Sequence, residues 1–334
     1  MYSQPKAGYY SEAVGLSDAA LKTKLYNIIS AGYISKGYDY LYTIYATSDV
    51  TADGKVWDMY STCTWTPGVK KCGNYSVVCD CYNREHSIPQ SWFNEASPMV
   101  SDAFHVYPTD GKVNGQRSNY PFGECNGGTT LSGGKGRLGS CTFPGYSGTV
   151  FEPVDEYKGD FARTYFYFAT RYQNIMTTIN GESFNKTTYP ALTDWAVNLF
   201  LKWSRQDPVS QKERDRCNAV EAYQKNRNPF IDYPELAEHI WGTKKGIPWS
   251  FTSAVDDVKI EFSISPNPVQ DVLRIKSDES QFHYVIYNLN GQVLMQNDVN
   301  GNSTISTSQL NNGMYLLELS AGTRKTIQKF VVNR

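Results

Sequence analysis

The chain has 334 residues, 40% of them hydrophobic, and a formal net charge of -1 from 32 basic and 33 acidic side chains. This length predicts about two domains with room for a buried core. The balanced charge gives no global signal for a polyanionic partner, although a local basic cleft can still attract one because clefts concentrate field lines. No run of 18 or more apolar residues occurs, which excludes a transmembrane helix.

The N-terminus, "MYSQPKAGYY", lacks the basic start and apolar stretch of a secretory signal peptide. If the protein is exported, we expect its signal peptide to have been removed and Met1 to have been added for expression. The first predicted element is an amphipathic helix in "LSDAALKTKLYNIISAG", which follows an N-cap at Ser17 or Asp18 and stops at Gly32.

Two strand-like segments follow, in "NYSVVCDCYNREHSI" (74–88) and "FHVYP" (104–108), with the β-branched and aromatic bias of pleated surfaces. Helical periodicity then predicts three further helices, over residues 160–176, 193–207 and 210–226. This half of the chain, with many helices and few strands, is predicted to be α+β.

Cysteine usage indicates an oxidising compartment, because seven cysteines are many for a reducing cytosol. Four of them crowd into one stretch: Cys63, Cys72, Cys79 and Cys81. We expect disulfides there, with buried thiols as the alternative; the C-x2-C pairs of structural zinc sites are absent. Cys125 and Cys141 flank a glycine-rich segment and are a candidate staple, and Cys217 is the candidate free thiol.

Past residue 250, short alternating runs from "VKIEFSI" to "TIQKFVV" replace helical periodicity and predict an all-β module. Asn290-Gly291 is a hairpin-turn candidate because both turn positions need positive φ, and Asn312-Gly313 is a second. "SPNP" (265–268) blocks a helix, and "SFTSAVDD" before it is a linker candidate. We place the boundary near residue 256, between an α+β domain (1–256) and a small β-sandwich domain (257–334).

The segment "NREHSIP" (83–89) places a carboxylate beside one of only four histidines. A neutral imidazole accepts a proton from water, so His86 is a candidate general base, with a hydrogen-bonded structural histidine as the alternative. Glu85 offers a hard oxygen ligand. Asn114 offers an amide oxygen on a short predicted helix after "FHVYP", with Thr109 as its N-cap; a turn or capping role is the alternative for Asn114.

One carboxylate and one amide oxygen suit a hard cation such as Mg2+, which keeps water and substrate phosphate in its other positions. The cation would stabilise transition-state charge while His86 activates the attacking water. Successive strand side chains face opposite sides, so Glu85 and His86 converge only if the strand ends or bulges there. Pro89 after Ile88 marks such an exit.

Four segments carry a family resemblance: "NREHSIPQSWF", "SDAFHVYPTDGKVNGQRSNYPFGE", "KGDFARTYFYFATRY" and "AYQKNRNPFIDYPELAEHIWG". In this order, and over about residues 10–245, the chain resembles the bacterial endonuclease I family of secreted or periplasmic nucleases. The resemblance implies a ββα-metal (His-Me finger) core surrounded by helices. It makes His86 the general base and gives one divalent cation to Glu85 and Asn114. Mg2+ is the expected cation, with Mn2+ and Ca2+ as alternatives.

The activity that the resemblance implies is hydrolysis of DNA, and often of RNA, with little sequence preference and with 5'-phosphate products. One departure bears on it: the family commonly has Asp-x-His-His where this chain has Asp102, Ala103, Phe104 and His105. The rival hypothesis that Phe104 raises is a surface-exposed nucleic-acid-binding protein or adhesin on an inactive nuclease scaffold.

The family also uses an arginine to steady the product phosphate, and Arg84, Arg117 and Arg137 are candidates for it. We prefer Arg117 as this catalytic residue because it lies three residues beyond Asn114, on a neighbouring helix face. Six basic side chains could line a phosphate-binding cleft, with solvated surface charge as the alternative: Lys112, Arg117, Lys135, Arg137, Arg163 and Arg171.

The β-rich tail carries a second resemblance, in "SISPNPVQDVLRI", "IYNLNGQVLMQ", "LNNGMYLLELSAG" and "KFVVNR". It resembles the C-terminal sorting domain that the type IX secretion system of certain Gram-negative bacteria recognises. This implies a secreted or cell-surface protein that meets the secretion machinery through its tail. We expect a monomer whose substrate is DNA or RNA.

Overall fold

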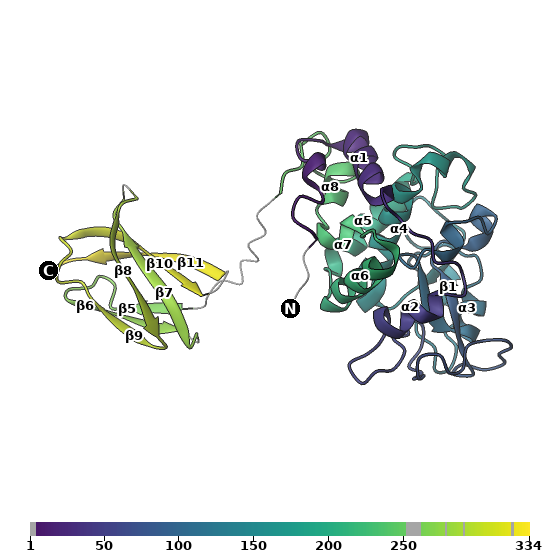
Figure 1. The fold of residues 1–334 in the computed structure, drawn as a ribbon, viewed down its shortest axis with the longest axis horizontal. Coiled ribbons are helices and arrows are strands. Elements are labelled where there is room, and N and C mark those ends of the chain that lie inside the picture. Colours follow the sequence, from purple (N-terminus) through teal and green to yellow (C-terminus); the bar gives the residue numbers. More distant parts are fainter. Residues whose placement is uncertain (1–4, 252–261, 278, 290, 322–323) are drawn as a thin grey trace. The chain divides into compact units, whose positions relative to one another are not determined.

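The computed structural model describes residues 5–251, 262–277, 279–289, 291–321 and 324–334. The chain forms two compact units, Met1–Ser250 and Phe251–Arg334 (Figure 1). Each unit has a hydrophobic core of its own. The boundary predicted near residue 256 falls within residues 252–261, outside the described residues.

In its described residues the first unit combines helices with two small antiparallel sheets, which confirms the α+β prediction. Its helices are α1 (Asp18–Ser30), α2 (Leu41–Ser48), α3 (Gly111–Arg117), α4 (Lys158–Arg171), α5 (Asp194–Gln206), α6 (Gln211–Gln224), α7 (Pro229–Asp232) and α8 (Leu236–Ile240). One sheet pairs β1 (Tyr82–His86) with β2 (Val106–Asp110), and the other pairs β3 (Arg137–Ser140) with β4 (Thr149–Glu152).

Helix α4 lies at the centre of this unit, with every residue after Lys158 buried, and α5, α1 and α7 pack around it (Figure 1). A helix that meets water on no face must pair its polar side chains inside the protein. Arg163 therefore donates to both carboxylate oxygens of Glu213, at 2.5 and 2.8 Å. This buried pair makes Arg163 a structural residue rather than part of a phosphate-binding cleft.

The predicted helices are present, with ends set by local chemistry. Helix α1 follows its N-cap at Ser17 as predicted. Helix α6 begins with a reciprocal capping box, in which the Ser210 and Glu213 side chains each accept from the other's backbone N–H. Helix α4 stops earlier than predicted, and the chain continues as a 3₁₀ turn over Gln173–Thr178.

Two disulfides, Cys63–Cys79 and Cys72–Cys81, confirm the predicted cross-links in the cysteine-rich stretch. The backbone conformation of one of these cysteines explains why the predicted strand over residues 74–88 was too long. Cys79 has a φ of 74°, a left-handed conformation that no strand accommodates, so β1 begins only at Tyr82. Cys217 is a free, fully buried thiol, as predicted.

The predicted Cys125–Cys141 staple is wrong, because both residues are free thiols. They face each other across an isolated antiparallel bridge, but their sulfur atoms are directed to different carbonyls. Cys125 Sγ lies 3.6 Å from the Gly127 oxygen, and Cys141 Sγ lies 3.7 Å from the Phe143 oxygen.

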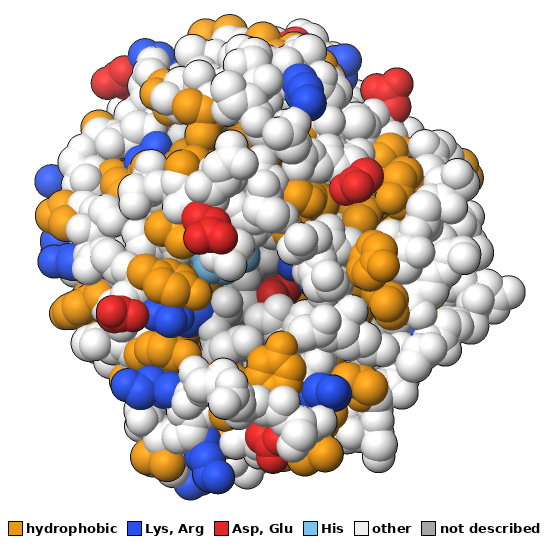
Figure 2. Space-filling model, turned by 90° about the vertical axis from the view of Figure 1, so that its right-hand side faces the viewer, with side chains coloured by type: hydrophobic (Ala, Val, Ile, Leu, Met, Phe, Trp, Pro, Cys, Tyr) orange, Lys and Arg blue, Asp and Glu red, His pale blue; other side chains and the backbone are white. Residues whose placement is uncertain are grey.

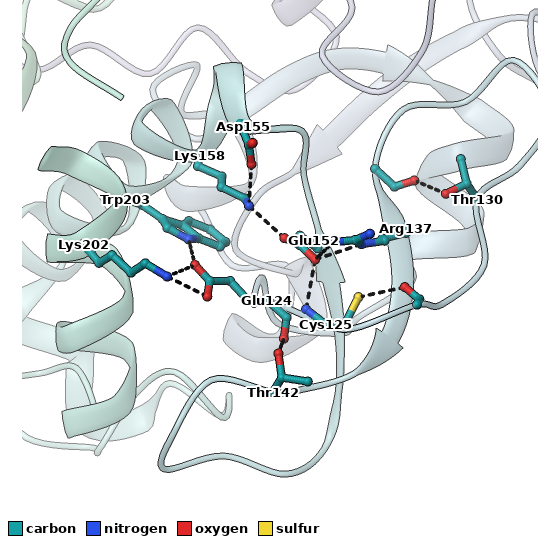
Figure 3. A network of polar contacts seen from close by, with 12 residues as sticks. Glu124, Cys125, Thr130, Arg137, Thr142, Glu152, Asp155, Lys158, Lys202 and Trp203 are labelled. Atoms are coloured by element: carbon teal, nitrogen blue, oxygen red, sulfur yellow. Dashed lines mark hydrogen bonds and ion pairs between the residues drawn. The ribbon is translucent and has the colours of Figure 1, made fainter. Parts of the chain in front are cut away.

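Ion pairs tie this region to the helices instead. Glu152, at the end of β4, accepts from Arg137 of β3 at 2.8 and 2.9 Å and from Lys158 of α4 at 2.8 Å (Figure 3). Glu124 accepts from Lys202 and from the indole of Trp203, both on α5 (Figure 3). The candidate basic residue Arg137 is therefore held by Glu152.

The second unit consists of two antiparallel sheets that share one apolar core, as predicted for the tail (Figure 1). Their strands are β5 (Phe262–Ser265), β6 (Val272–Ser277), β7 (Gln281–Tyr287), β8 (Val293–Asn300), β9 (Ser303–Ser306), β10 (Gly313–Ala321) and β11 (Arg324–Val332). The orders are β11-β10-β7-β8 and β5-β6-β9. Strand β9 was not predicted, because Ile305 is its only apolar residue. Asn290 of the predicted hairpin turn lies outside the described residues.

Candidate active site

Strands β1 and β2 and helix α3 follow one another closely in space. Glu85 lies opposite Tyr107 in the β1-β2 register, and α3 starts directly after β2. The predicted N-cap at Thr109 is wrong, because β2 continues through Thr109 to Asp110 and Asp110 caps the helix. Its carboxylate accepts from the backbone N–H of Val113 at 2.9 Å and of Cys79 at 2.7 Å.

Helix α3 packs directly against the disulfide-linked stretch, which approaches it closely at two glycine positions. A Cβ at Gly111 would lie 2.5 Å from the Cys72 sulfur, and one at Gly115 would lie 2.5 Å from the Tyr75 hydroxyl. The Cys72–Cys81 disulfide thus supports α3 next to Asn114. A side chain on this helix is therefore fixed relative to the end of β1.

A cavity of about 250 Å3 opens where the end of β1 meets α3. Figure 2 shows a hollow on this face, where a pale-blue histidine and a red acidic side chain reach the surface. All four predicted site residues line this cavity: Glu85, His86, Asn114 and Arg117. Strand β1 ends at His86, so Glu85 and His86 both reach the cavity at the predicted exit.

The His86 ring is held in one orientation. Its Nε2 lies 3.0 Å from the Val100 carbonyl, and because a carbonyl only accepts, Nε2 carries the proton. Nδ1 is then the atom left to accept one. Tyr38 stacks on the ring at 5.8 Å between centroids. Burial, followed by the neighbouring His105 ring, lowers the pKa of His86 to about 3, so the imidazole is neutral at neutral pH.

Glu85 and Arg117 form a buried ion pair, with side chains 2% and 1% exposed. Glu85 Oε1 accepts from Arg117 Nη1 at 2.9 Å and from the Tyr60 hydroxyl at 2.8 Å. Burial raises the pKa of Glu85 in spite of these two neighbours. Glu85 Oε2 has no hydrogen-bond partner among the described residues, so one carboxylate oxygen remains available for a cation.

Arg117 also holds the end of β1 in place. Its Nη1 donates to the His86 carbonyl at 2.7 Å, and its Nη2 donates to the Ser87 carbonyl at 2.6 Å. The guanidinium lies over the Phe122 ring, 4.6 Å from its centroid. These bonds go to protein groups and fix the backbone on which Glu85 and His86 stand.

Asn114 presents an oxygen to the same cavity. Its Nδ2 donates to Asn83 Oδ1 at 2.7 Å, which leaves the Asn114 Oδ1 without a partner among the described residues. An unused carboxylate oxygen and an unused amide oxygen fit a hard divalent cation with most positions open. Within the described residues, no three His, Cys, Asp or Glu side chains form a larger metal-binding cluster.

A basic side chain with two aromatic neighbours forms another wall of the cavity. Arg84 lies over the rings of Tyr38 and Tyr42, with its Cζ 3.5 and 4.8 Å from their centroids. Its Nη1 donates to the Tyr38 carbonyl and to Asp39 at 3.1 and 2.8 Å. Its Nη2 has no partner among the described residues, and the side chain is 17% exposed.

The departure at Phe104 is a matter of core packing. Phe104 is buried and its ring lies 5.0 Å from that of Tyr167. The adjacent His105 keeps a place beside the site: its ring is 5.8 Å from that of His86, and its Nε2 lies 2.7 Å from the Met99 carbonyl. The Phe104 side chain therefore does not orient His86.

Two contributors to the site were missed from the sequence. Tyr60, which donates to Glu85, lies 25 residues upstream in a stretch without a motif. The Val100 carbonyl, which orients His86, is a backbone group that no residue pattern reveals. The segment Met99–Ser101 forms a 3₁₀ turn, and the proline before it was the only local signal.

Residues 17–235 match a family model described as Endonuclease I. The chain belongs to the endonuclease I family. An extracellular ribonuclease of Bacillus amyloliquefaciens is 36% identical over 239 residues, which cover 70% of this chain and 78% of that protein. An extracellular ribonuclease of Bacillus subtilis is 34% identical over 237 residues, with the same coverage. A periplasmic deoxyribonuclease of Aeromonas hydrophila is 27% identical over 140 residues, covering 41% of this chain and 50% of that protein.

Residues 263–333 match a secretion system C-terminal sorting domain. The endonuclease I unit, up to Ser250, is called the nuclease unit below, and the second unit is called the sorting unit. Together with the extracellular and periplasmic relatives, the sorting domain makes this a secreted or cell-surface protein. None of the helices in the described part of the chain has the length and apolar character needed to cross a membrane.

Proposed function

We propose that the protein is a divalent-metal-dependent endonuclease that hydrolyses RNA and DNA with little sequence preference and leaves 5'-phosphate ends. The observation that carries the proposal is the cavity where Glu85, His86 and Asn114 meet. Each of the three presents an unused acceptor atom there, on a backbone fixed by Arg117 and by the disulfide-linked stretch. The ββα-metal core expected from the sequence is part of this proposal, since β1, β2 and α3 occur in that order.

His86 is the general base of the proposed reaction. The Val100 carbonyl retains the proton on Nε2, so Nδ1 takes a proton from the attacking water. The water oxygen then bonds to phosphorus while the bond from phosphorus to the 3'-oxygen breaks. The 3'-oxygen takes a proton from solvent, which leaves a 3'-hydroxyl and a 5'-phosphate.

Glu85 Oε2 and Asn114 Oδ1 would hold the cation, for which Mg2+ is the expected ion and Mn2+ or Ca2+ the alternatives. When bound, the cation would supply positive charge that stabilises the negative charge on the oxygens around the five-coordinate phosphorus. Glu85 itself gains from such a partner, because it is a buried carboxylate with a raised pKa.

We assign the two arginines of the cavity different roles. Arg117 acts as a positioning residue, since its observed hydrogen bonds go to Glu85 and to two backbone carbonyls. Arg84 retains a free Nη2 at the partly exposed wall, and two tyrosine rings hold its guanidinium plane. Arg84, rather than the Arg117 favoured from the sequence, is therefore the proposed contact for the product phosphate.

The relatives support RNA as a substrate beside DNA. The two that match over 70% of this chain are named ribonucleases, whereas the deoxyribonuclease match covers 41%. Weak sequence preference is expected, because the cavity offers charge and a metal site for phosphate.

The test incubates the purified protein with RNA, single-stranded DNA and double-stranded DNA, each with Mg2+ and with a chelator. We expect cleavage with Mg2+, none with the chelator, and 5'-phosphate ends that a ligase accepts. Glu85→Gln removes the charge of the cation ligand at constant size, and we expect it to need much more Mg2+ for the same rate. Undiminished cleavage in chelator would overturn the proposal. A shifted nucleic-acid band without cleavage would instead favour the binding protein on an inactive scaffold.

A further inference from the structure

An arginine outside the active site is buried without a hydrogen-bond partner among the described residues. Arg171, the last residue of α4, is 8% exposed, yet no described residue gives its guanidinium a hydrogen bond or an ion pair. Its Nε is fully buried and unsatisfied. The charge of Asp102 favours the charged guanidinium, but its carboxylate accepts from the hydroxyls of Tyr167 and Tyr172 and forms no hydrogen bond with Arg171. Leaving a charged donor without an acceptor is costly.

Two aromatic rings hold the guanidinium of Arg171. Its Cζ lies over Tyr33 at 4.6 Å and over Tyr172 at 5.0 Å from the ring centroids. Contacts of this kind act on the charge of the guanidinium and occupy none of the N–H donors at its edge. That edge is the one that grips carboxylate or phosphate with two parallel hydrogen bonds.

Arg171 lines a cavity of about 370 Å3, which is large enough for one small organic molecule. The remaining wall is largely apolar, formed by Phe93, Met99 and Ile179 among others. Two amides, Asn94 and Asn174, stand beside these apolar groups. The chemistry of the cavity is therefore a cationic edge, an apolar wall and two amide groups.

The wall of this cavity also contributes to the active site. Met99 lines the cavity, its carbonyl holds His105, and the next carbonyl, of Val100, orients His86. The Phe93 ring lies in the wall, 6.1 Å from the ring of His86. A ligand beside Arg171 would thus contact the segment that fixes the general base.

We propose that the Arg171 cavity binds a nucleotide, with its phosphate on the N–H edge of Arg171 and its base against the apolar wall. The choice of a nucleotide rests on the proposed function, since a nuclease meets nucleotides as parts of its substrate and as products. The amide groups suit the polar edge of a base, and an aromatic wall suits its face. The nucleotide comes either from a bound strand or from free product, and both sources share this chemistry.

Calorimetric titration of the full chain with 5'-AMP in chelator tests the site without catalysis. We expect 5'-AMP to bind and adenosine, which lacks the phosphate, to bind at least about tenfold more weakly. Arg171→Gln should weaken 5'-AMP at least about tenfold. Asn174→Asp places a negative charge at an exposed wall position, where folding is not at stake, and should also weaken 5'-AMP but not adenosine. His86→Ala should leave binding unchanged, which separates this site from the catalytic cavity.

A second arm identifies the source of the nucleotide. If Arg171→Gln raises KM for a long oligonucleotide but not for a trinucleotide, the site holds part of the strand. If only 5'-AMP binding is lost, the site holds free product. Failure of wild-type protein to bind 5'-AMP, or equal affinities in wild type, Arg171→Gln and Asn174→Asp, would refute the site. These two binding measurements do not require nuclease activity, so failure of the proposed site is distinct from failure of the proposed reaction.

Discussion

The nuclease unit and the sorting unit differ in where they place charged side chains. In the nuclease unit, Arg117–Glu85 and Arg163–Glu213 are ion pairs whose side chains are at most 4% exposed. In the described part of the sorting unit, the ion pair Arg334–Asp271 and the hydrogen-bonded pair His283–Asp298 keep at least 34% of each side chain exposed. The core of the sorting unit is instead built from apolar residues that alternate along its strands.

This difference shows how function can be recognised among buried charges. Burial alone does not mark a site. Arg163 is as buried as Arg117, yet it only forms a structural pair in which both oxygens of Glu213 accept hydrogen bonds. At the active site, in contrast, Glu85, His86 and Asn114 each keep one acceptor atom unused. Unused acceptor atoms gathered in one cavity mark a candidate ligand site, whereas a single unsatisfied atom elsewhere, such as the buried hydroxyl of Ser30 or Thr170, does not.

The largest expected effect is that of replacing His86 in the nuclease unit, with His283 of the sorting unit as the control. His86→Ala should lower the rate of phosphodiester hydrolysis by ~10²- to 10⁴-fold, because the proton acceptor is lost. His283→Ala, in the exposed pair of the sorting unit, should leave the rate unchanged. Initial rates on RNA, with unfolding midpoints to verify folding, measure both. An active His86→Ala variant would remove the assigned role.

The next effect is on stability. Arg117→Met leaves the Glu85 carboxylate buried without its guanidinium partner, and we expect the free energy of unfolding to fall by ~3–5 kcal/mol. Arg205→Met breaks a half-exposed pair with Glu238 and should cost ~1 kcal/mol or less. Urea unfolding compares them. The double variant Glu85→Gln with Arg117→Met should be more stable than Arg117→Met alone, and the opposite order would contradict the charge argument.

Removal of the Cys72–Cys81 disulfide should lower the free energy of unfolding by ~2–4 kcal/mol. The double variant Cys72→Ala with Cys81→Ala should also lose activity, because α3 packs against this disulfide and carries Asn114. The matched control is Cys141→Ala, which removes a half-buried free thiol. Full activity in the double variant would show that α3 is held by other contacts.

A buried lysine gives the nuclease unit a pH dependence of its free energy of unfolding. Burial lowers the pKa of Lys22 to about 7, against 10.5 for the ordinary side chain. Between these values the unfolded chain binds the proton and the folded chain does not, so stability rises with pH by up to ~1.4 kcal/mol per unit. Below about 7 the slope vanishes. Urea unfolding at pH 8 and 9 should show this slope in wild type and in Lys276→Met, but not in Lys22→Met.

The smallest effect should follow deletion of residues 251–334, which removes the sorting unit. The proposed active site and the core of the nuclease unit lie entirely within residues up to Ser250. We expect kcat/KM for RNA to stay unchanged while export is lost. A large fall in kcat/KM would show that the tail contributes to catalysis and that the two units are not independent in function.

The sequence was sufficient wherever a local pattern carries the information. Helical periodicity located α1, α5 and α6, alternation located most of the sorting strands, and the cluster of four cysteines indicated two disulfides. The "NREHSIP" motif and its proline placed Glu85 and His86 at a strand end. The sequence-based prediction failed at Cys125 and Cys141, whose spacing suggested a disulfide but whose sulfur atoms are directed to different carbonyls.

Residue types and their spacing thus determined by themselves which side chains are candidates for the chemistry, because proton acceptors and cation ligands are recognisable as residues. Tertiary structure alone decided how each is used. The Val100 carbonyl selects the accepting nitrogen of His86, and Arg117 is committed to the end of β1. Arg171 is left without a hydrogen bond to any described residue, beside a cavity. These outcomes depend on backbone carbonyls and on contacts between residues far apart in the chain, which no local pattern records.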